Sequence, residues 1–318
     1  MPVLNDSEYQ PSFLFKSGHF NSIYSHISRR TESCTFDRKR IQTPDDDFLD
    51  IDFVHTGSSQ LIVLFHGLEG SSDSSYIKEF ANGFSQLDYD IAAMNYRGCS
   101  GEMNRQLRLY HSGSTDDIHT VLTEITTGYD RVYLIGFSLG GNMCLKYLGE
   151  QVYDIPSVVQ GCVSISPPTD LESCSLQIMK RQNWIYEKRF LTSLADKVKQ
   201  KEKQFPGKVP LSKLSEAKRI YSFDDMFVAP MHGFKNAKDY YQQCSSKQFL
   251  SNITHPSLIL TSIDDPFLSK AAIPVKEAQQ NSLIYLYPCK FGGHVGFHQK
   301  GNRKSWMLEK SIEFIQQL

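Results

Sequence analysis

A serine, an aspartate and a histidine stand in contexts that fit nucleophilic catalysis. Ser138 is the centre of a Gly-x-Ser-x-Gly pattern, with Gly136 before it and Gly140 after it. Small residues at these positions let a strand and a helix approach closely around a strained turn that projects the serine. Such a hydroxyl becomes a nucleophile when a base removes its proton and a carboxylate orients that base. The pattern predicts a nucleophile elbow, with a plain tight turn as the alternative.

The acid is expected after the serine and before the histidine. Asp264 and Asp265 follow the apolar run 257–263, and Pro266 keeps Asp265 out of a helix. We predict that Asp265 is the acid. Two carboxylates facing one imidazole would repel, so Asp264 is expected to hydrogen-bond to backbone amides of its own loop. A surface aspartate pair in a turn is the alternative.

The base is predicted to be His294, which lies in a Gly-Gly-His-x-Gly sequence after the last predicted strand. The glycines let this loop bend so that the imidazole reaches Ser138, although most single histidines are structural. His298, four residues later, is expected to face solvent and serves as a comparison. Together the three side chains predict acyl transfer through a serine nucleophile.

An oxyanion must be stabilised next to the serine. His66 opens the sequence His-Gly-Leu-Glu-Gly directly after an apolar run, where a second N–H donor is expected. We assign the donors to the backbone N–H groups of Leu68 and Leu139, the second at the start of a helix whose dipole also favours negative charge. A glycine-rich turn without this role is the alternative for the first loop.

A second histidine with nearby carboxylates lies in the sequence Tyr-His-Ser-Gly that begins at Tyr110. His111 with Asp116 or Asp117 could form an alternative acid and base pair. We favour a supporting or structural role for His111, as for His66 and Asp264, in positioning the groups that react. Cys144 follows the elbow by one helical turn and is predicted to be a small buried thiol instead of a second nucleophile.

The elements that position these residues alternate between strands and helices. Alternating or continuous apolar runs predict strands, the first of them half-exposed. Helices are predicted near 76–87, 116–126 and 142–148. This alternation predicts a doubly wound, mainly parallel α/β sheet. The predicted strands are 48–54, 61–65, 90–95, 132–135, 158–165, 257–263 and 283–287.

Two segments lie outside this alternation. Residues 1–40 are predicted to be an irregular N-terminal arm that covers the main domain, which spans 41–318. Residues 169–255 lack strand patterns and are predicted to form a helical cap insertion beside the elbow. The cap is rich in Lys and Arg between 180 and 219. These residues could steer an anionic substrate or contact a membrane surface, but a solvated helical face is the commoner explanation.

Composition bounds the function classes. Hydrophobic residues make up 40% of the chain and the net charge is -1, which argues against disorder and against nucleic acid as the main partner. The seven cysteines are scattered and include no Cys-x-x-Cys pair, as expected of free thiols in a reducing cytoplasm. We expect no secretory leader, no transmembrane segment and no metal or cofactor, since no ligand spacing or phosphate-binding motif occurs.

Several motifs in combination resemble those of the YheT-like α/β-hydrolases, bacterial relatives of a eukaryotic group that includes the yeast medium-chain fatty acid ethyl ester synthase/esterases. The resemblance covers most of the chain from about Gly18, and it implies the α/β-hydrolase fold with Ser138, Asp265 and His294 as the triad. The early sequence Gly-His-Phe-Asn departs from the usual His-x-Gln-Thr pattern. The matching stretches are HGLEGSS from His66, YRGCSGEMNR from Tyr96, YHSGSTDD from Tyr110, GFSLGGNM from Gly136, DYYQQCSS from Asp239, DDPF from Asp264 and GGHVGF from Gly292.

These observations predict a cytoplasmic serine carboxylester hydrolase that acts on short-to-medium acyl esters or lipid esters. An alcohol acyltransferase that uses the same acyl-enzyme is one alternative. A non-catalytic member of the fold that binds a ligand or partner is another. The identity of the ester and the oligomeric state are not encoded in these motifs.

Overall fold

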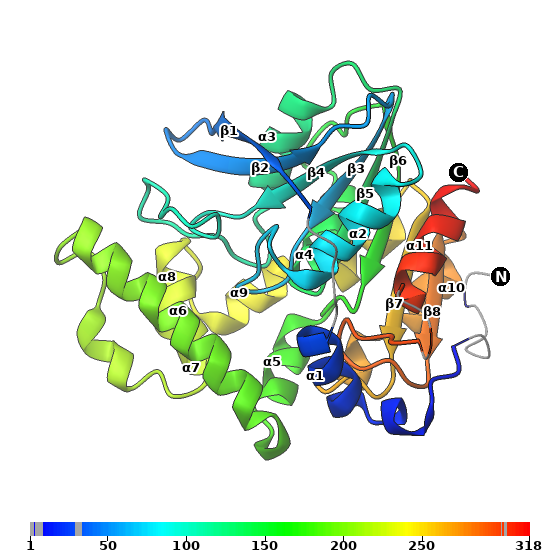
Figure 1. The fold of residues 1–318 in the computed structure, drawn as a ribbon. Helices are drawn as coiled ribbons and strands as arrows, with labels where there is room; N and C mark the ends of the chain where they lie inside the picture. Colours follow the sequence, from blue (N-terminus) through cyan, green and yellow to red (C-terminus); the bar gives the residue numbers. More distant parts are fainter. Residues whose placement is uncertain (1–2, 4–8, 29–33, 300, 302–303) are drawn as a thin grey trace.

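An eight-stranded sheet forms the centre of the molecule (Figure 1). The computed structural model describes residues 3, 9–28, 34–299, 301 and 304–318. The strand order is β1-β2-β4-β3-β5-β6-β7-β8, and the pairs from β4 to β8 are parallel. The predicted mainly parallel sheet is therefore confirmed. The strands are β1 (Asp37–Gln42), β2 (Phe48–Val54), β3 (Gln60–Phe65), β4 (Asp90–Asn95), β5 (Arg131–Phe137), β6 (Val159–Ile165), β7 (Ser257–Ser262) and β8 (Ile284–Cys289).

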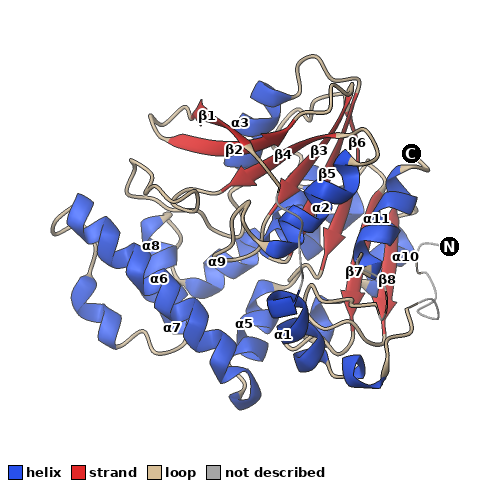
Figure 2. Cartoon of the chain, in the orientation of Figure 1, coloured by secondary structure: helices blue, strands red, loops and turns tan. Residues whose placement is uncertain are grey.

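Helices cover both faces of the sheet (Figure 2). One face packs against α2 (Ser75–Ser85) and α11 (Trp306–Ile315). The other packs against α3 (Thr115–Ile125), α4 (Leu139–Gly149) and α10 (Val275–Gln280). Every residue of α4 is buried, which explains why its sequence is nearly continuously apolar. This central helix begins directly after Ser138 and is held rigidly in the core.

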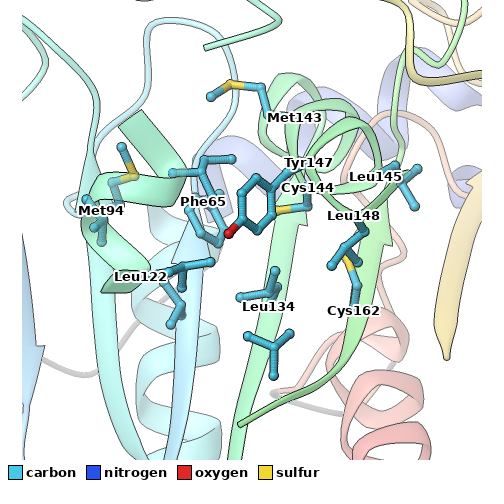
Figure 3. Packing of buried hydrophobic residues seen from close by; sticks show 14 of the residues in the cluster. Phe65, Met94, Leu122, Leu134, Met143, Cys144, Leu145, Tyr147, Leu148 and Cys162 are labelled. Carbon is cyan, nitrogen blue, oxygen red and sulfur yellow. The ribbon is translucent and has the colours of Figure 1, made fainter. Parts of the chain in front are cut away.

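The close packing of α4 on the sheet is visible in Figure 3. Met143, Cys144 and Tyr147 of α4 lie with Phe65 of β3 and Leu134 of β5 in one buried cluster. Burial of apolar side chains of this size contributes roughly 1.5–3 kcal/mol each. Cys144 is buried and free, as predicted for a packing thiol.

The N-terminal segment is more ordered than the predicted irregular arm. Residues Gly18–Ser28 form helix α1, a 3-10 turn spans Phe13–Lys16, and β1 pairs antiparallel with β2. The prediction of a half-exposed first strand at 48–54 was also wrong. Strand β1 precedes it and pairs with its edge, and residues 48–53 of β2 are all buried. Asp50 and Asp52 are buried in ion pairs whose arginines lie on β1; the pairs are Arg40–Asp50 at 2.8 Å and Arg38–Asp52 at 2.6 Å.

The predicted strand-free insertion lies between β6 and β7. Its α-helices are α5 (Leu171–Ile178), α6 (Trp184–Gln204), α7 (Ile220–Phe223), α8 (Ala229–Met231) and α9 (Ala237–Cys244), with a π-turn at Asp224–Val228. We call residues 169–255 the cap. In Figure 1 its helices stand at the edge where β3 to β6 end. In the described part of the chain, no helix combines the length and the apolar character needed to cross a membrane.

Candidate active site

Ser138 occupies a strained turn between β5 and α4. Its backbone has φ 51° and ψ −118°, a conformation that is costly for a residue with a side chain. A Cβ atom on Gly136 would lie 2.4 Å from the carbonyl oxygen of Gly140, and one on Gly140 would lie 2.4 Å from that of Phe65. The two small residues of the sequence pattern are thus required by close backbone approach. The predicted elbow geometry is present.

The three side chains named from the sequence meet at the carboxyl ends of the strands. The Oγ of Ser138 is 2.9 Å from Nε2 of His294. Nδ1 of the same ring is 2.8 Å from Oδ2 of Asp265. The imidazole therefore bridges the hydroxyl and the carboxylate, which is the arrangement needed to take a proton from a serine and stabilise the resulting imidazolium.

Asp265 is held in place by its own turn. Its Oδ1 accepts hydrogen bonds from the backbone N–H groups of Phe267 at 2.7 Å and Leu268 at 3.3 Å, which leaves Oδ2 for the histidine. Asp264 points elsewhere: its Oδ1 accepts from the N–H of Gly293, at 2.9 Å, in the histidine loop. Burial raises the pKa of Asp264. The two adjacent carboxylates therefore perform different tasks, one on the imidazole and one on the loop that carries it.

Helix α1 also braces the histidine loop. The N–H of His294 donates to Oγ of Ser22 at 2.8 Å, and the N–H of Val295 donates to Oγ of Ser166 at 3.2 Å. The expectation that His298 faces solvent was wrong. Its ring is half-buried, and the centroids of this ring and the ring of Phe15 are 4.2 Å apart, because the N-terminal segment packs over this loop.

Leu139 directly follows Ser138, and Leu68, the other predicted oxyanion donor, lines the same cavity as that serine. Within the described residues, the N–H groups of Leu68 and Leu139 donate to no protein acceptor, so both are available to a ligand. Gly67 lies against the serine, since a Cβ on it would be 3.3 Å from that of Ser138. His66 shapes this loop. Its Nδ1 contacts the carbonyl oxygen of Gly67 at 2.7 Å, and burial lowers the pKa of His66 to about 3, so the ring is neutral.

Glu69, in the same loop, was missed as a functional candidate. Its carboxylate lies 2.9 Å from Nζ of Lys197, accepts from the hydroxyl of Tyr110 at 2.6 Å, and accepts from the hydroxyl of Ser193. Burial raises the pKa of Glu69, but the Lys197 ammonium and these hydrogen bonds outweigh it and lower the pKa below its usual value. The N–H of Glu69 donates back to Tyr110 at 2.8 Å.

This network joins the loop of residues 66–70 to the cap. Ser193, Lys197 and Lys201 are spaced four residues apart on α6 and therefore share one face of the helix. Nζ of Lys201 donates to the carbonyl oxygens of Asn104 at 2.7 Å and Gln106 at 2.5 Å. The basic run in the cap is thus not one solvated face: Lys197 and Lys201 are buried anchors, whereas Lys180, Arg181 and Lys188 are exposed.

A cavity lies between the elbow and the cap. Ser138 and His294 form part of its wall, and most of the remaining lining is apolar, contributed by both the main domain and the cap. Mostly apolar walls with a few polar groups are typical of sites that bind small organic ligands. The apolar lining residues are Leu68, Leu139, Pro168, Leu171, Cys174, Ile178, Phe190, Leu194, Ile220, Val228, Phe267 and Leu268.

One carboxyl group of the cap also lines the cavity. The Oδ2 of Asp224 accepts from the hydroxyl of Tyr241 at 2.5 Å, and among the described residues no donor contacts its Oδ1. Burial raises the pKa of Asp224 to about 7. This residue therefore changes charge near neutral pH at the wall of the cavity. Sequence reasoning missed it because the segment around it carries no motif of a site.

His111 does not form an alternative acid and base pair. Its Nδ1 accepts from the N–H of Gly113 at 3.1 Å, and its ring packs against His232. Asp117 instead pairs with Arg97 at 2.7 Å, and Asp116 pairs with Arg108 at 2.8 Å. The ring of His111 lines the cavity, and burial lowers its pKa well below the usual range. Among the described residues, no group of His, Cys, Asp and Glu side chains could hold a metal ion.

Comparison with known sequences gives relatives along most of the chain. Residues 60–299 match the sequence model of the alpha/beta hydrolase fold. YheT of Escherichia coli strain K12, an esterase by name, is 34% identical over 92% of this chain and 88% of its own length. Human phospholipase ABHD3 is 31% identical over 77% of this chain and 60% of its own length. The monoacylglycerol lipase of Saccharomyces cerevisiae is 26% identical over 86% of this chain and 62% of its own length.

Solved structures with a similar fold include other esterases. The Pyrococcus furiosus esterase Pf2001 superposes with a TM-score of 0.60, at 16% identity, over 91% of this chain and 92% of the other. An esterase from Exiguobacterium antarcticum gives a TM-score of 0.54, at 17% identity, over 87% of this chain and 99% of the other. At these identities the likeness concerns the fold.

Proposed function

Because the chain belongs to the α/β-hydrolase fold family and is a carboxylic ester hydrolase, we propose that it cleaves short-to-medium acyl esters or lipid esters through an acyl-enzyme on Ser138. The observation that carries the proposal is the continuous contact from Ser138 Oγ through His294 to Asp265, at 2.9 and 2.8 Å. In the proposed mechanism, Nε2 of His294 accepts the serine proton across the 2.9 Å contact.

In the first half of the reaction, Ser138 Oγ attacks the ester carbonyl carbon while His294 Nε2 takes its proton. The carbonyl oxygen becomes an oxyanion, which accepts hydrogen bonds from the N–H groups of Leu68 and Leu139. Each such donor typically contributes about 10²–10³ in kcat. His294 then gives the proton to the departing alkoxide. The alcohol leaves, and the acyl group remains bonded to Ser138.

In the second half, water replaces the alcohol. His294 removes a proton from the water as its oxygen attacks the acyl carbon, and the same two N–H groups hold the second oxyanion. Collapse of this intermediate returns the proton to Ser138 and releases the carboxylic acid. Throughout, Asp265 holds the imidazole in the tautomer that presents Nε2 to the serine and stabilises the imidazolium.

The substrate class follows from the cavity. Its predominantly apolar walls favour the hydrocarbon part of an ester, because each buried CH₂ gains about 0.8 kcal/mol. Asp224 and the hydroxyl of Tyr241 provide a polar position within these walls. Relatives named phospholipase and monoacylglycerol lipase act on lipid esters, which supports the same class here. We also place the enzyme in the cytoplasm, since all seven cysteines are free.

Substitution of the nucleophile tests the mechanism. We expect Ser138→Ala protein to lose ester hydrolysis by at least about 10³-fold and to lose labelling by a fluorophosphonate probe. Cys144→Ala protein is the matched control, because this thiol is buried one turn along the same helix. A panel of p-nitrophenyl esters of increasing acyl length would then measure selectivity. Wild-type hydrolysis by Ser138→Ala protein, or failure of the wild type to react with the probe, would contradict the proposal.

A further inference from the structure

Helix α1 presents an apolar stripe to solvent. Phe20, Ile23 and Ile27 are exposed and recur at the three- and four-residue spacing that places them on one side of a helix. The opposite side, with Asn21, Ser22 and Ser25, is buried against the main domain. Two more apolar side chains, Phe13 and Leu14, are exposed just before the helix, at 85% and 63%. An amphipathic helix normally turns such a stripe inward.

The cap continues this apolar surface. His19, on the flank of the stripe next to Ile23, has its ring stacked on that of Tyr186 at 5.8 Å between centroids. Trp184 and Ile185, which directly precede Tyr186, are each 57% exposed. Figure 1 shows α1 beside the cap. We call Phe13, Leu14, Phe20, Ile23, Ile27, Trp184 and Ile185 the docking surface.

In the two segments that carry this surface, residues 9–28 and 173–195, the exposed charged side chains are cationic. Residues 9–28 contain no Asp or Glu, and Lys16 is exposed among them. Between residues 173 and 195 the single acidic residue is Glu187, which is buried and paired with Arg219 at 3.0 Å. Lys180, Arg181 and Lys188 are exposed in the same segment. The apolar side chains are thus accompanied by ammonium and guanidinium groups without exposed carboxylates in either segment.

We propose that the docking surface binds the face of a lipid bilayer that contains anionic lipid. Apolar side chains on an interfacial helix enter the boundary between head groups and acyl chains, while Lys and Arg contact lipid phosphates. Trp is favoured at this boundary because its ring is apolar and its N–H is polar. Charge complementarity favours a bilayer over a second copy of this chain, which would bring the same cations together.

The position of the surface connects it to the reactive groups. The ring of Tyr186 packs on that of Phe267 with 4.7 Å between the centroids. The ring of Phe267 in turn packs on that of His294 with 4.3 Å between the centroids. The buried side of α1 holds the N–H of His294 through Ser22. A docked molecule would therefore hold its cavity close to the lipid. Docking is measured as binding to vesicles, so a negative result for docking would not contradict the hydrolysis proposed above, and the reverse also holds.

The two tryptophans make the binding directly observable. Trp184 is exposed and Trp306 is buried, so entry into a bilayer would change the emission of Trp184 alone. We expect Ser138→Ala protein, which leaves the lipid intact, to float with vesicles of phosphatidylcholine and phosphatidylglycerol. Its emission should shift to shorter wavelength. Pure phosphatidylcholine vesicles should retain less protein. Equal retention on both would overturn the role of anionic lipid, and no retention on either would overturn the proposal.

Substitutions locate the contact. The double variant Phe13→Ser with Ile27→Ser removes two side chains that are 85% and 77% exposed, and should bind vesicles at least about tenfold more weakly. Val152→Ser, which removes a side chain 65% exposed outside the docking surface, should bind as the wild type. Thermal unfolding of each variant would verify that the fold is retained. Equal binding by the double variant and Val152→Ser would contradict the proposal.

Two double charge-reversal variants and a measurement of the oligomeric state complete the test. Lys180→Glu with Arg181→Glu should reduce binding to anionic vesicles, whereas Lys203→Glu with Lys208→Glu, farther along the cap, should not. If both double variants lost binding to anionic vesicles equally, the attraction would be a general effect of positive charge, and the assigned surface would be wrong. Sedimentation tests the competing occupant. A wild-type dimer that Phe13→Ser with Ile27→Ser converts to a monomer would assign the surface to a second copy and overturn lipid docking.

Discussion

At the scale of single residues, the two adjacent aspartates that follow β7 have different partners. Asp265 contacts the imidazole of His294, and Asp264 contacts the backbone of the loop that carries it. Loss of the carboxylate that orients a catalytic histidine lowers kcat by about 10⁴ in a serine protease triad. We expect Asp265→Asn to lower kcat by about 10³–10⁴ and Asp264→Asn by less than about tenfold, both measured by steady-state ester hydrolysis. Comparable losses would show that the assignment is wrong.

The buried carboxyl of Asp224 should make ester binding depend on pH. Its pKa is raised to about 7 by burial, so raising the pH from 6 to 8 places a negative charge on the cavity wall. That charge disfavours an apolar acyl group. We expect KM for an apolar ester to rise several-fold over this range, and Asp224→Asn to remove the rise. The pH profile of kcat, measured for the same two proteins, provides the internal comparison.

The same group makes stability depend on pH with a definite sign. An unfolded aspartate has a pKa of about 3.9, so between about pH 4 and 7 the folded protein binds more protons at Asp224 than the unfolded chain does. The contribution of this residue to the free energy of unfolding therefore falls as pH rises through that range. Urea midpoints at pH 5 and pH 8 should differ less in Asp224→Asn than in the wild type.

At the level of elements, the ion pair between Lys197 and Glu69 helps to join α6 to the loop of residues 66–70, which carries the proposed oxyanion donor Leu68. Without Lys197, the carboxylate of Glu69 would remain buried without its counter-ion, next to the N–H of Leu68. A displacement of about 1 Å in a catalytic group can cost about 10²-fold. We expect Lys197→Met to lower kcat by about 10- to 100-fold. Lys199→Met, on an exposed position of the same helix, should have wild-type kinetics.

A second substitution separates this coupling from simple unfolding. Lys197→Met with Glu69→Gln removes both charges, so the stability lost through the unpaired carboxylate should be partly recovered. Denaturant unfolding of the two single variants and the double variant gives the interaction energy. Additive effects would mean that the pair does not couple the cap to the loop.

Strands and turns that have a recognisable pattern in their own residues could be predicted from the sequence. Elements that depend on partners elsewhere in the chain could not. The runs 61–65 and 91–94 are apolar because β3 and β4 are buried on both faces, and the glycines around Ser138 and His294 mark special turns. Strand β1 has the sequence Asp-Arg-Lys-Arg-Ile-Gln, and its pairing with β2 depends on arginines that meet Asp50 and Asp52. The predicted irregular arm of residues 1–40 includes most of this strand, which has no apolar pattern of its own.

The same distinction applies to the candidate site. Ser138, Asp265 and His294 are each recognisable from neighbours a few residues away, and the structure brings them together. Glu69 meets Ser193 and Lys197 across 124 and 128 residues, so no local pattern identifies them as partners. Lysines of the cap read as solvated for the same reason, although two of them are buried. The docking surface also requires two segments that are distant in the sequence.

For the whole molecule, a buried arginine joins three separate parts of the main domain. The guanidinium of Arg97 is fully buried and pairs with Asp47 at 2.7 Å, Asp117 at 2.7 Å and Asp45 at 3.0 Å. These carboxylates lie before β2 and in α3. Removing one partner of a buried ion pair typically costs about 3–5 kcal/mol because a charge is left uncompensated.

Arg97→Met should therefore lower the free energy of unfolding by about 3–5 kcal/mol, measured by denaturant titration. Arg131→Met, at an exposed position where β5 begins, should change it by less than about 0.5 kcal/mol. If the two variants were equally stable, the cluster would not be a major determinant of the fold.

The contact between Ser22 and His294 joins residues 272 positions apart. During synthesis Ser138 leaves the ribosome 156 residues before His294, the base in the proposed mechanism. Under that mechanism, the Ser138 hydroxyl of a nascent chain is inert until the loop that carries His294 packs against helix α1. Reactivity toward an ester would then report that helix α1 and the His294 loop have packed together, and a variant that lacks residues 1–28 should lose ester hydrolysis although it retains Ser138, Asp265 and His294.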